Sequence, residues 1–230
     1  GDVLNMILKK IIIEGDSKYE SEKKLFPIRW KSHHITELFM ELCPQFELDG
    51  NRQLTIFATR NRRKGAAKYN NYKSFHVSSY YLESEQIEKL EFLKDTDAER
   101  YILELIKDVL IDIVDEYDKN KDKRSVIENT TKRIMEMDFS LKKRIDKLCK
   151  KKKNGKNRAE VIRWLDKEVG EAWYVEFINE ESRNTRIEWL TDKTNYLDRR
   201  DYFKKAEWEG NRFIIRDKLG EEVISIDVLE

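Results

Sequence analysis

The chain has 230 residues, of which 40% are charged and 39% hydrophobic, yet its formal net charge is only +1. Such a balance does not predict bulk attraction to nucleic acid or to an anionic membrane, and no apolar run approaches the length of a membrane span. Two cysteines, Cys43 and Cys149, are too few for a disulfide framework, and no paired metal-ligand cluster or signal-peptide pattern is present. We therefore expect a cytoplasmic globular protein that binds no membrane, no metal and no cofactor.

The first 83 residues predict a β-rich region. Residues 11–13 are all isoleucine, a β-branched run that predicts a central strand at 7–14 with both faces buried. A hairpin is predicted at 46–59, because Asp49 and Gly50 form the pair that a tight turn with positive φ prefers. The other elements predicted here are a short helix at 35–43 and a strand at 74–82.

The middle of the chain predicts two helices after a short leading helix at 84–93. Apolar residues between Tyr101 and Tyr117 recur at alternating steps of one and three, the period of a helix that buries one face. A looser three-four repeat continues from Ile127 to Leu148. Each helix start carries a candidate capping box, Thr96 with Glu99 and Ser125 with Glu128. Because the link is short, we expect residues 97–150 to form an antiparallel helical hairpin.

The last third of the chain predicts a helix followed by antiparallel strands. The lysine-rich run 150–156 has no apolar residue and is the best candidate for a domain boundary. A short helix is expected at 157–170, since Asn157 and Glu160 could cap it. From residue 172 onward the apolar period becomes two, which predicts strands near 173–178, 186–190, 202–208, 212–216 and 222–228.

The predicted fold class is therefore α+β, in three regions. Residues 1–83 form a β-rich N-terminal region, residues 84–153 a central antiparallel helical hairpin, and residues 154–230 a helix with an antiparallel β-meander.

The charges are segregated along the chain, and the segment 60–73 is the first candidate for a binding site. Residues 50–82 carry seven basic side chains and no acidic one, whereas residues 83–118 carry four basic and thirteen acidic ones. Basic side chains can neutralise phosphates and tyrosine rings can stack on bases, so this loop suits single-stranded nucleic acid. It suits an acidic protein partner equally, and a plain solvated loop is the third alternative. The candidate binding residues are Arg60, Arg62, Arg63, Lys64, Lys68, Tyr69, Tyr72 and Lys73.

A second basic segment, residues 142–158, is the densest in the chain. Cations at a helix end interact favourably with the helix dipole, which explains part of this run without a ligand. Acidic residues at near-helical spacing on the first long helix, among them Asp108 and Asp112, could face this segment across the hairpin. Neutralisation within the molecule would then account for the alternating blocks of charge.

No catalytic constellation is evident in the sequence. A Ser-His or Cys-His scheme would have to recruit one of the three histidines, His33, His34 or His76, and the eight glycines stand apart rather than forming a phosphate loop. His76 is expected on a strand, where a structural role is commoner than that of a base. An enzyme is therefore the less favoured class.

The features above favour a non-enzymatic protein that binds another macromolecule, with a protein as the expected partner. In general character, rather than through a motif, the chain resembles a bacterial toxin-neutralising immunity protein or a similar inhibitor. Such a protein would act through charged surface patches. The alternative is a nucleic-acid-binding protein, which includes a nuclease, that uses segments 60–73 and 142–158.

Overall fold

The computed structural model describes residues 6–118, 122–153 and 155–229, and the α+β class is confirmed. The chain divides into two compact units, Gly1–Ser140 and Leu141–Glu230. The sequence predicted three regions with borders at 83/84 and 153/154, whereas the single division of the structure follows Ser140.

The first unit contains a four-stranded sheet in the order β1-β2-β4-β3, in which only β3 is antiparallel to its neighbour. Its strands are β1 (Lys10–Gly15), β2 (Gln53–Ala58), β3 (Tyr69–Tyr72) and β4 (Val77–Tyr81). The prediction that β1 is a central strand is wrong, since β1 lies at an edge of the sheet. Only Ile11 and Ile13 are buried, and Ile12 between them is half-buried, so the isoleucine run covers one face rather than two.

The predicted hairpin at 46–59 is wrong, although its turn is present. Asp49 and Gly50 have φ angles of +48° and +72°, and a single bridge joins Leu48 to Asn51 across them. The residues before the turn add no strand to the sheet, and β2 pairs in parallel with β1 and β4 instead. The local turn signal was correct, but it could not indicate which distant strand β2 would join.

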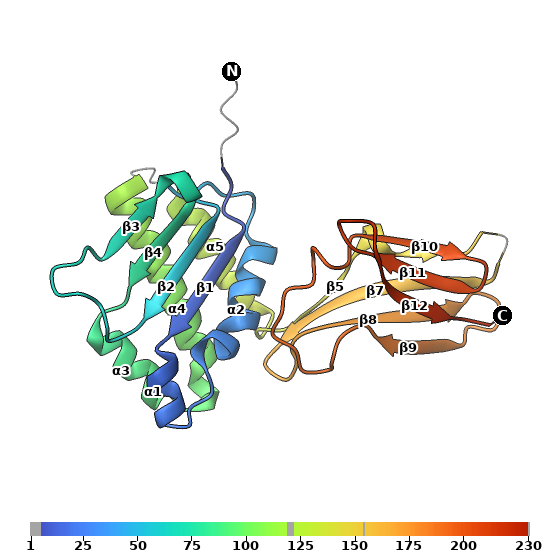
Figure 1. Ribbon diagram of the computed structural model, residues 1–230, viewed down its shortest axis with the longest axis horizontal. Helices are drawn as coiled ribbons and strands as arrows, with labels where there is room; N and C mark the ends of the chain where they lie inside the picture. Colours follow the sequence, from blue (N-terminus) through green and yellow to red (C-terminus); the bar gives the residue numbers. More distant parts are fainter. Residues whose placement is uncertain (1–5, 119–121, 154, 230) are drawn as a thin grey trace, which may run out of the picture. The chain divides into compact units, whose positions relative to one another are not determined.

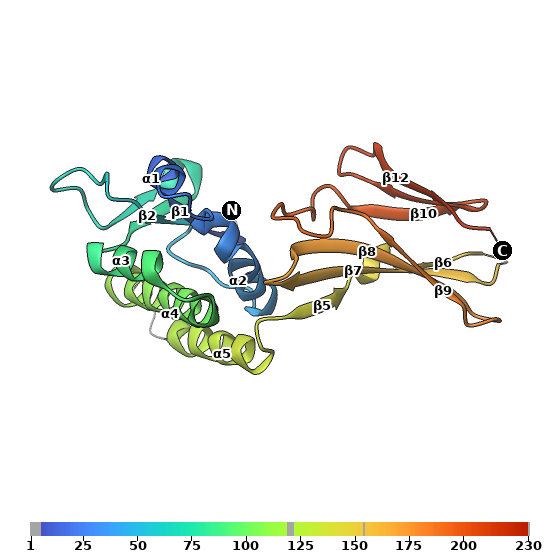
Figure 2. The same ribbon diagram turned by 90° about the horizontal axis from the view of Figure 1, so that it is seen from below.

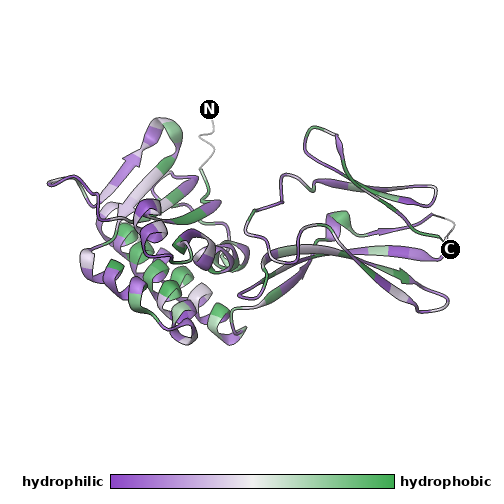
Figure 3. Ribbon diagram, turned by 60° about the horizontal axis from the view of Figure 1, so that its bottom comes forward, coloured by the Kyte–Doolittle hydropathy of each residue, from purple (hydrophilic) through white to green (hydrophobic). Residues whose placement is uncertain are grey.

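Among the described residues, the helices that accompany this sheet are α1 (Ser17–Glu22), α2 (Ile28–Leu42), α3 (Ser84–Phe92), α4 (Asp95–Ile113) and α5 (Lys123–Glu136). A π-helical turn, Val114–Asp118, extends α4. Figure 1 shows α4 and α5 behind the sheet, and Figure 2 shows them side by side, as predicted for the helical hairpin. The helices α2, α3, α4 and α5 carry both hydrophobic and hydrophilic residues, as expected for helices that bury one face (Figure 3), whereas α1 has no buried residue.

The helix ends differ from the predictions in three places. Neither α4 nor α5 has a side-chain cap, and the capping box of this unit joins Glu83 and Gln86 at α3. The second helix of the hairpin ends at Glu136, not near residue 148. Asp138 and Phe139 adopt positive φ angles of +52° and +55°, which end the helix, and a strand follows.

The second unit is a two-layer β structure (Figure 2). The large sheet has the order β5-β7-β8-β9, with β6 also paired to β7, and the small sheet has the order β10-β11-β12. The strands of the large sheet are β5 (Leu141–Arg144), β6 (Lys150–Lys151), β7 (Asn157–Asp166), β8 (Gly170–Asn179) and β9 (Thr185–Trp189). Those of the small sheet are β10 (Lys205–Glu209), β11 (Arg212–Arg216) and β12 (Glu222–Asp227).

A hydrophobic core lies between the two sheets. Trp173, Val175 and Phe177 on β8 pack there with Phe213 and Ile215 on β11. The predicted antiparallel meander near the C-terminus is confirmed by the small sheet.

The predicted helix at 157–170 is wrong, because these residues form β7 and the turn into β8. Burial alternates strictly along β7, with Ala159, Val161 and Leu165 inside. The spacing of Val161, Ile162 and Leu165 also fits a helix, so the apolar period was ambiguous over so short a stretch. The lysine-rich run 150–156 is not a linker between compact units: it contains β6, and Lys152 N donates to Asn157 O at 2.9 Å.

A close backbone approach makes Gly170 the critical glycine of the second unit. Its φ is +65°, and a Cβ at this position would lie 2.4 Å from Asn195 O and 2.6 Å from the Tyr196 ring. Gly210 has a similar φ of +57° but open space around it. We expect Gly170→Ala to lower the free energy of unfolding by about 3 kcal/mol or more, and Gly210→Ala by about 1–2 kcal/mol. Chemical denaturation of both variants measures the difference, and equal losses would contradict the close packing at Gly170.

Candidate binding surfaces

The structure divides the predicted binding residues of segment 60–73 into two groups. Arg60, Arg62, Lys68 and Tyr69 make contacts within the first unit, although the Arg60 side chain remains 49% exposed. Arg63, Lys64, Tyr72 and Lys73 are exposed.

The two engaged arginines lie against aromatic rings. Arg60 pairs with Glu91 at 2.6 Å, and its guanidinium lies over the Tyr19 ring. Arg62 donates to Ala66 O within its own loop and lies over the Tyr81 ring, 5.6 Å from the ring centroid. Both arginines therefore fix the loop to the folded unit.

Lys68 is part of a charged cluster beneath the loop. Its Nζ lies 2.8 Å from Asp112 Oδ2 on α4, and the Tyr80 hydroxyl donates to the same oxygen at 2.5 Å. Burial by itself would raise the pKa of Asp112, but the hydrogen bonds from Lys68 and Tyr80 outweigh it and lower the pKa. Burial and the neighbouring Asp112 carboxylate raise the pKa of Tyr80, so the phenol stays protonated.

Tyr69 is a buried structural residue rather than a stacking platform. It is 7% exposed, and its hydroxyl donates to Asp49 Oδ2 at 2.8 Å and accepts from Asn51 Nδ2 at 3.1 Å. Burial and the contact with Asp49 raise its pKa. The network ties β3 to the Asp49 turn.

The four exposed residues do not form a continuous surface along the chain. Arg63 and Lys64 lie in the loop before β3, whereas Tyr72 and Lys73 lie at its end. Tyr72 is 50% exposed, and Phe75 nearby in sequence is 78% exposed.

The three histidines occupy two different settings. His33 and His34 are buried on α2, and His34 Nε2 lies 2.6 Å from Glu99 Oε2. His76 is exposed and adopts a φ of +54° at the end of a 3-10 turn, so the prediction that it lies on a strand is wrong.

Several cations of the second basic segment, residues 142–158, pair with carboxylates of the same unit. Arg144 pairs with Glu160 at 2.5 Å, and Lys151 pairs with Glu180 at 2.9 Å. Arg158 lies between the same two carboxylates, 3.3 Å from Glu160 and 3.5 Å from Glu180.

The acidic residues of α4 and of the π-helical turn after it have other partners than predicted. Asp112 pairs with Lys68, Asp115 with Arg124 at 3.3 Å, and Glu104 with Lys107 at 2.8 Å. Neutralisation within the molecule does occur, but the loop before β3 and the helices themselves supply these cations. The segment 142–158 forms strands, so it could not lie along α4 as the second helix of a hairpin.

Sequence reasoning did not single out a surface of the second unit that carries three aromatic side chains. One side of the large sheet faces away from the core, and we call its apolar part the aromatic face. Its members come from β7, β8 and β9: Ile162, Trp164, Tyr174, Ile178, Ile187 and Trp189.

The strand register places Ile162, Tyr174 and Trp189 in one row across the sheet. Ile162 pairs with Tyr174 across β7 and β8, and Tyr174 pairs with Trp189 across β8 and β9. The Trp189 ring lies 5.3 Å from the Tyr174 ring and 6.3 Å from the Trp164 ring. Ile187 and Trp189 are 53% and 42% exposed, so the face is open at β9.

Charged side chains border the aromatic face. Lys142 on β5 places its Nζ 4.4 Å from the centre of the Trp164 ring, a cation–π contact. Arg144, Arg158 and Glu160 lie along the adjoining part of β5 and β7 and pair with one another as described above. Glu176 lies on the same side, between Tyr174 and Ile178 on β8 and opposite Ile187 on β9, so a carboxylate interrupts the apolar residues. Apolar side chains with polar groups among and around them are typical of a protein-binding surface.

The outer side of the small sheet has the opposite character. Arg212 pairs with Glu209 at 3.1 Å and Glu222 at 3.2 Å, and Arg216 pairs with Glu207 at 2.8 Å. These ion pairs cover the strands with charge. The two outer sides therefore differ: among the described strand residues of this unit, large exposed apolar side chains lie on the large sheet, at Ile187 and Trp189.

Part of the aromatic face could be predicted from the sequence. The predicted strands 173–178 and 186–190 already place Tyr174 and Trp189 on strands, with Ile178 and Ile187 at period two. Trp164 and Ile162 were lost because β7 was predicted as a helix. Strand order, which brings β7 and β9 to either side of β8, was not available from the sequence.

Comparison with known proteins supplies no relative. No protein-family description, no curated protein and no solved structure matches the chain. In the described part of the chain, none of the helices combines the length and the apolar character that a bilayer crossing requires.

Variants of Lys68 and Lys64 test whether the paired lysine of segment 60–73 stabilises the fold and the exposed one does not. We expect Lys68→Met to lower the free energy of unfolding at pH 7 by about 1 kcal/mol, because it removes the cation from the Asp112 carboxylate. Lys64→Met, in the exposed part of the same loop, should leave stability unchanged.

The stability difference between wild type and Lys68→Met should depend on pH. The lowered pKa of Asp112 stabilises the folded state above the pKa of the unfolded chain, and this stabilisation is lost as pH falls through the folded pKa. The stability difference between wild type and Lys68→Met should therefore shrink below about pH 4 in denaturation experiments. An unchanged difference at low pH would contradict the Lys68–Asp112 pairing.

Proposed function

We propose that this chain is a non-enzymatic protein that binds another protein, and that the aromatic face of the second unit is its main contact surface. The observation that carries the proposal is the exposure of Ile187 and Trp189 beside Trp164 and Tyr174, on a sheet whose counterpart is covered by ion pairs. Large exposed apolar patches on otherwise polar proteins mark interaction sites.

The composition of the face supports a protein partner. Binding energy at protein interfaces is concentrated in tryptophan, tyrosine and arginine, and such residues cluster at the centre with polar groups around them. Tyr174 and Trp189 are held by ring contacts, so little side-chain freedom is lost when a partner covers them. The paired charges of Arg144 and Glu160 beside the face offer a polar border at low electrostatic cost.

One specific observation favours nucleic acid as the second candidate. Lys142 lies directly over the Trp164 ring, and basic residues beside an aromatic platform are the elements with which proteins hold single strands. Against this alternative, Arg144, Lys151 and Arg158 already pair with carboxylates. Fewer cations are then available for phosphates than the sequence of segment 142–158 suggests.

Within the protein-binding class, we propose an inhibitory role of the immunity-protein type. An inhibitor of that kind works by covering a partner's active site through shape and charge complementarity. A captured partner should therefore lose its activity when the complex forms, which an assay of that partner with and without this protein measures.

The test of the proposed surface uses one double variant and one matched control. Ile187→Ser combined with Trp189→Ser removes two exposed members of the aromatic face. Leu219→Ser removes a 76% exposed leucine from the turn between β11 and β12 in the same unit. Wild type and both variants are immobilised and incubated with extract of the organism that encodes the chain.

We expect a protein that wild type and Leu219→Ser retain and that the double variant binds about 10- to 100-fold more weakly. Thermal melting of the double variant checks that the fold is intact. If all three proteins retain the same partner equally, the aromatic face is not the contact surface. If nucleic acid is retained instead, with affinity that falls steeply with salt, the second candidate replaces the first.

A further inference from the structure

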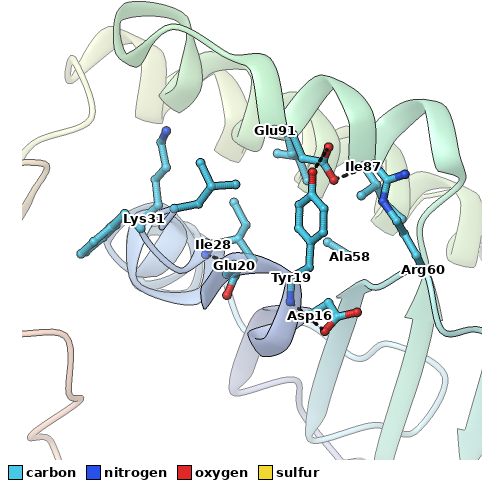
Figure 4. A pocket seen from close by; sticks show the side chains of 12 residues that line it. Asp16, Tyr19, Glu20, Ile28, Lys31, Ala58, Arg60, Ile87 and Glu91 are labelled. Atoms are coloured by element: carbon cyan, nitrogen blue, oxygen red, sulfur yellow. Dashed lines mark hydrogen bonds and ion pairs between the residues drawn. The ribbon is translucent and has the colours of Figure 1, made fainter. Parts of the chain in front are cut away.

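The first unit contains a pocket of about 100 Å³. It lies at the carboxyl ends of β1 and β2, with α1, α2 and α3 around it (Figure 4). In open sheets with parallel strands, ligands bind beyond the carboxyl ends of the strands. The position alone therefore makes the pocket a candidate ligand site.

The backbone holds one carboxylate, that of Glu20, at the wall of this pocket. Glu20 Oε1 accepts a hydrogen bond from Ile28 N, the first residue of α2, at 2.9 Å. It also lies so close to Gly15 at the end of β1 that a Cβ on Gly15 would come within 2.2 Å of it. A side chain at position 15 would therefore displace the Glu20 carboxylate.

The other charged residues of the pocket already have partners. The Tyr19 hydroxyl and Arg60 occupy the two oxygens of Glu91, at 2.9 and 2.6 Å. Asp16 accepts from Asn61 at 3.0 Å, and Lys31 lies 3.3 Å from Asp95. The cations at the pocket are therefore engaged, which disfavours an anionic ligand.

Glu20, in contrast, has no cation beside it among the residues that the structure describes. Burial raises its pKa, and the charges of Glu14 and Asp16 add to that rise, while the hydrogen bond from Ile28 N opposes it. Glu14 is paired with Arg29. A positive group that entered the pocket would relieve both the burial and the repulsion of the Glu20 carboxylate.

The rest of the lining is apolar. It includes Leu25, Ile28, Ala58, Ile87 and Leu90. The volume is somewhat smaller than that of a cavity of about 150 Å³ that holds benzene, so a chain of about four carbons fits. We infer that the pocket binds a short alkylamine, with the ammonium group on Glu20 and the alkyl chain against Ile28 and Ile87.

The test is a titration of the full chain with n-butylamine at neutral pH, where the amine is charged, followed by NMR. n-Butanol, which has the same length and no charge, is the ligand control. Glu20→Gln keeps the hydrogen-bond acceptor for Ile28 N and removes the charge. Glu22→Gln makes the same change on the exposed side of α1 and is the protein control.

We expect n-butylamine to bind in about the millimolar range, n-butanol to bind more weakly, and Glu20→Gln to lose at least about tenfold in affinity. Glu22→Gln should bind as wild type does. Ala58→Leu, which fills the pocket and keeps Glu20, should also abolish binding. If Glu20→Gln fails to fold, Ala58→Leu tests whether n-butylamine binds in this pocket.

Absence of n-butylamine binding to wild type, or equal binding to wild type and Glu20→Gln, would overturn the inference. The inference does not depend on the proposed function. The Ile187→Ser, Trp189→Ser variant should bind n-butylamine normally, and loss of amine binding in that variant would show that the two sites are not independent.

Discussion

The buried ion pair between Arg163 and Glu171 is the interaction on which the second unit depends. Arg163 donates to both Glu171 oxygens, at 3.2 and 2.8 Å, and the Trp173 indole donates to one of them at 2.7 Å. Because strand side chains alternate, a slip of β7 by one residue would turn Arg163 outward and carry Trp164 into the core. A charge left unpaired in the core is costly, so the pair fixes the register of β7 against β8. That register is what keeps Trp164 and Tyr174 on the outer side.

The charges that dominate the composition are used mainly to hold each unit together. The positive segment 60–73 meets the negative α3 and α4 through Arg60–Glu91 and Lys68–Asp112, and the positive segment 142–158 meets carboxylates of its own unit. Alternating blocks of charge in the sequence therefore correspond to neighbouring elements in space. Two features stand apart from this pairing of charges: the aromatic face of the large sheet and the Glu20 carboxylate at the wall of the pocket.

Secondary structure was predicted most accurately where the apolar period was long and fitted only one type of element. Nine apolar positions at helical spacing predicted α4 and the π-helical turn that extends it, and clear alternation after residue 172 predicted the small sheet. Short apolar segments failed, since Val161, Ile162 and Leu165 suit a helix or a strand equally. Of the predicted binding residues, Lys68 pairs with Asp112 and Tyr69 donates a hydrogen bond to Asp49, and both carboxylates come from distant parts of the chain. No local pattern encodes such partners, nor the close approach of Glu20 to Gly15.

The most direct test of the central claim, that the aromatic face contacts a protein partner, is hydroxyl-radical footprinting with mass spectrometry. Trp189 and Tyr202 belong to the same unit and are 42% and 46% exposed, so both should be oxidised in the free protein. When the partner is bound, oxidation of Trp189 should fall severalfold while that of Tyr202 stays the same. Equal oxidation of Trp189 in the free and the bound protein would contradict the account.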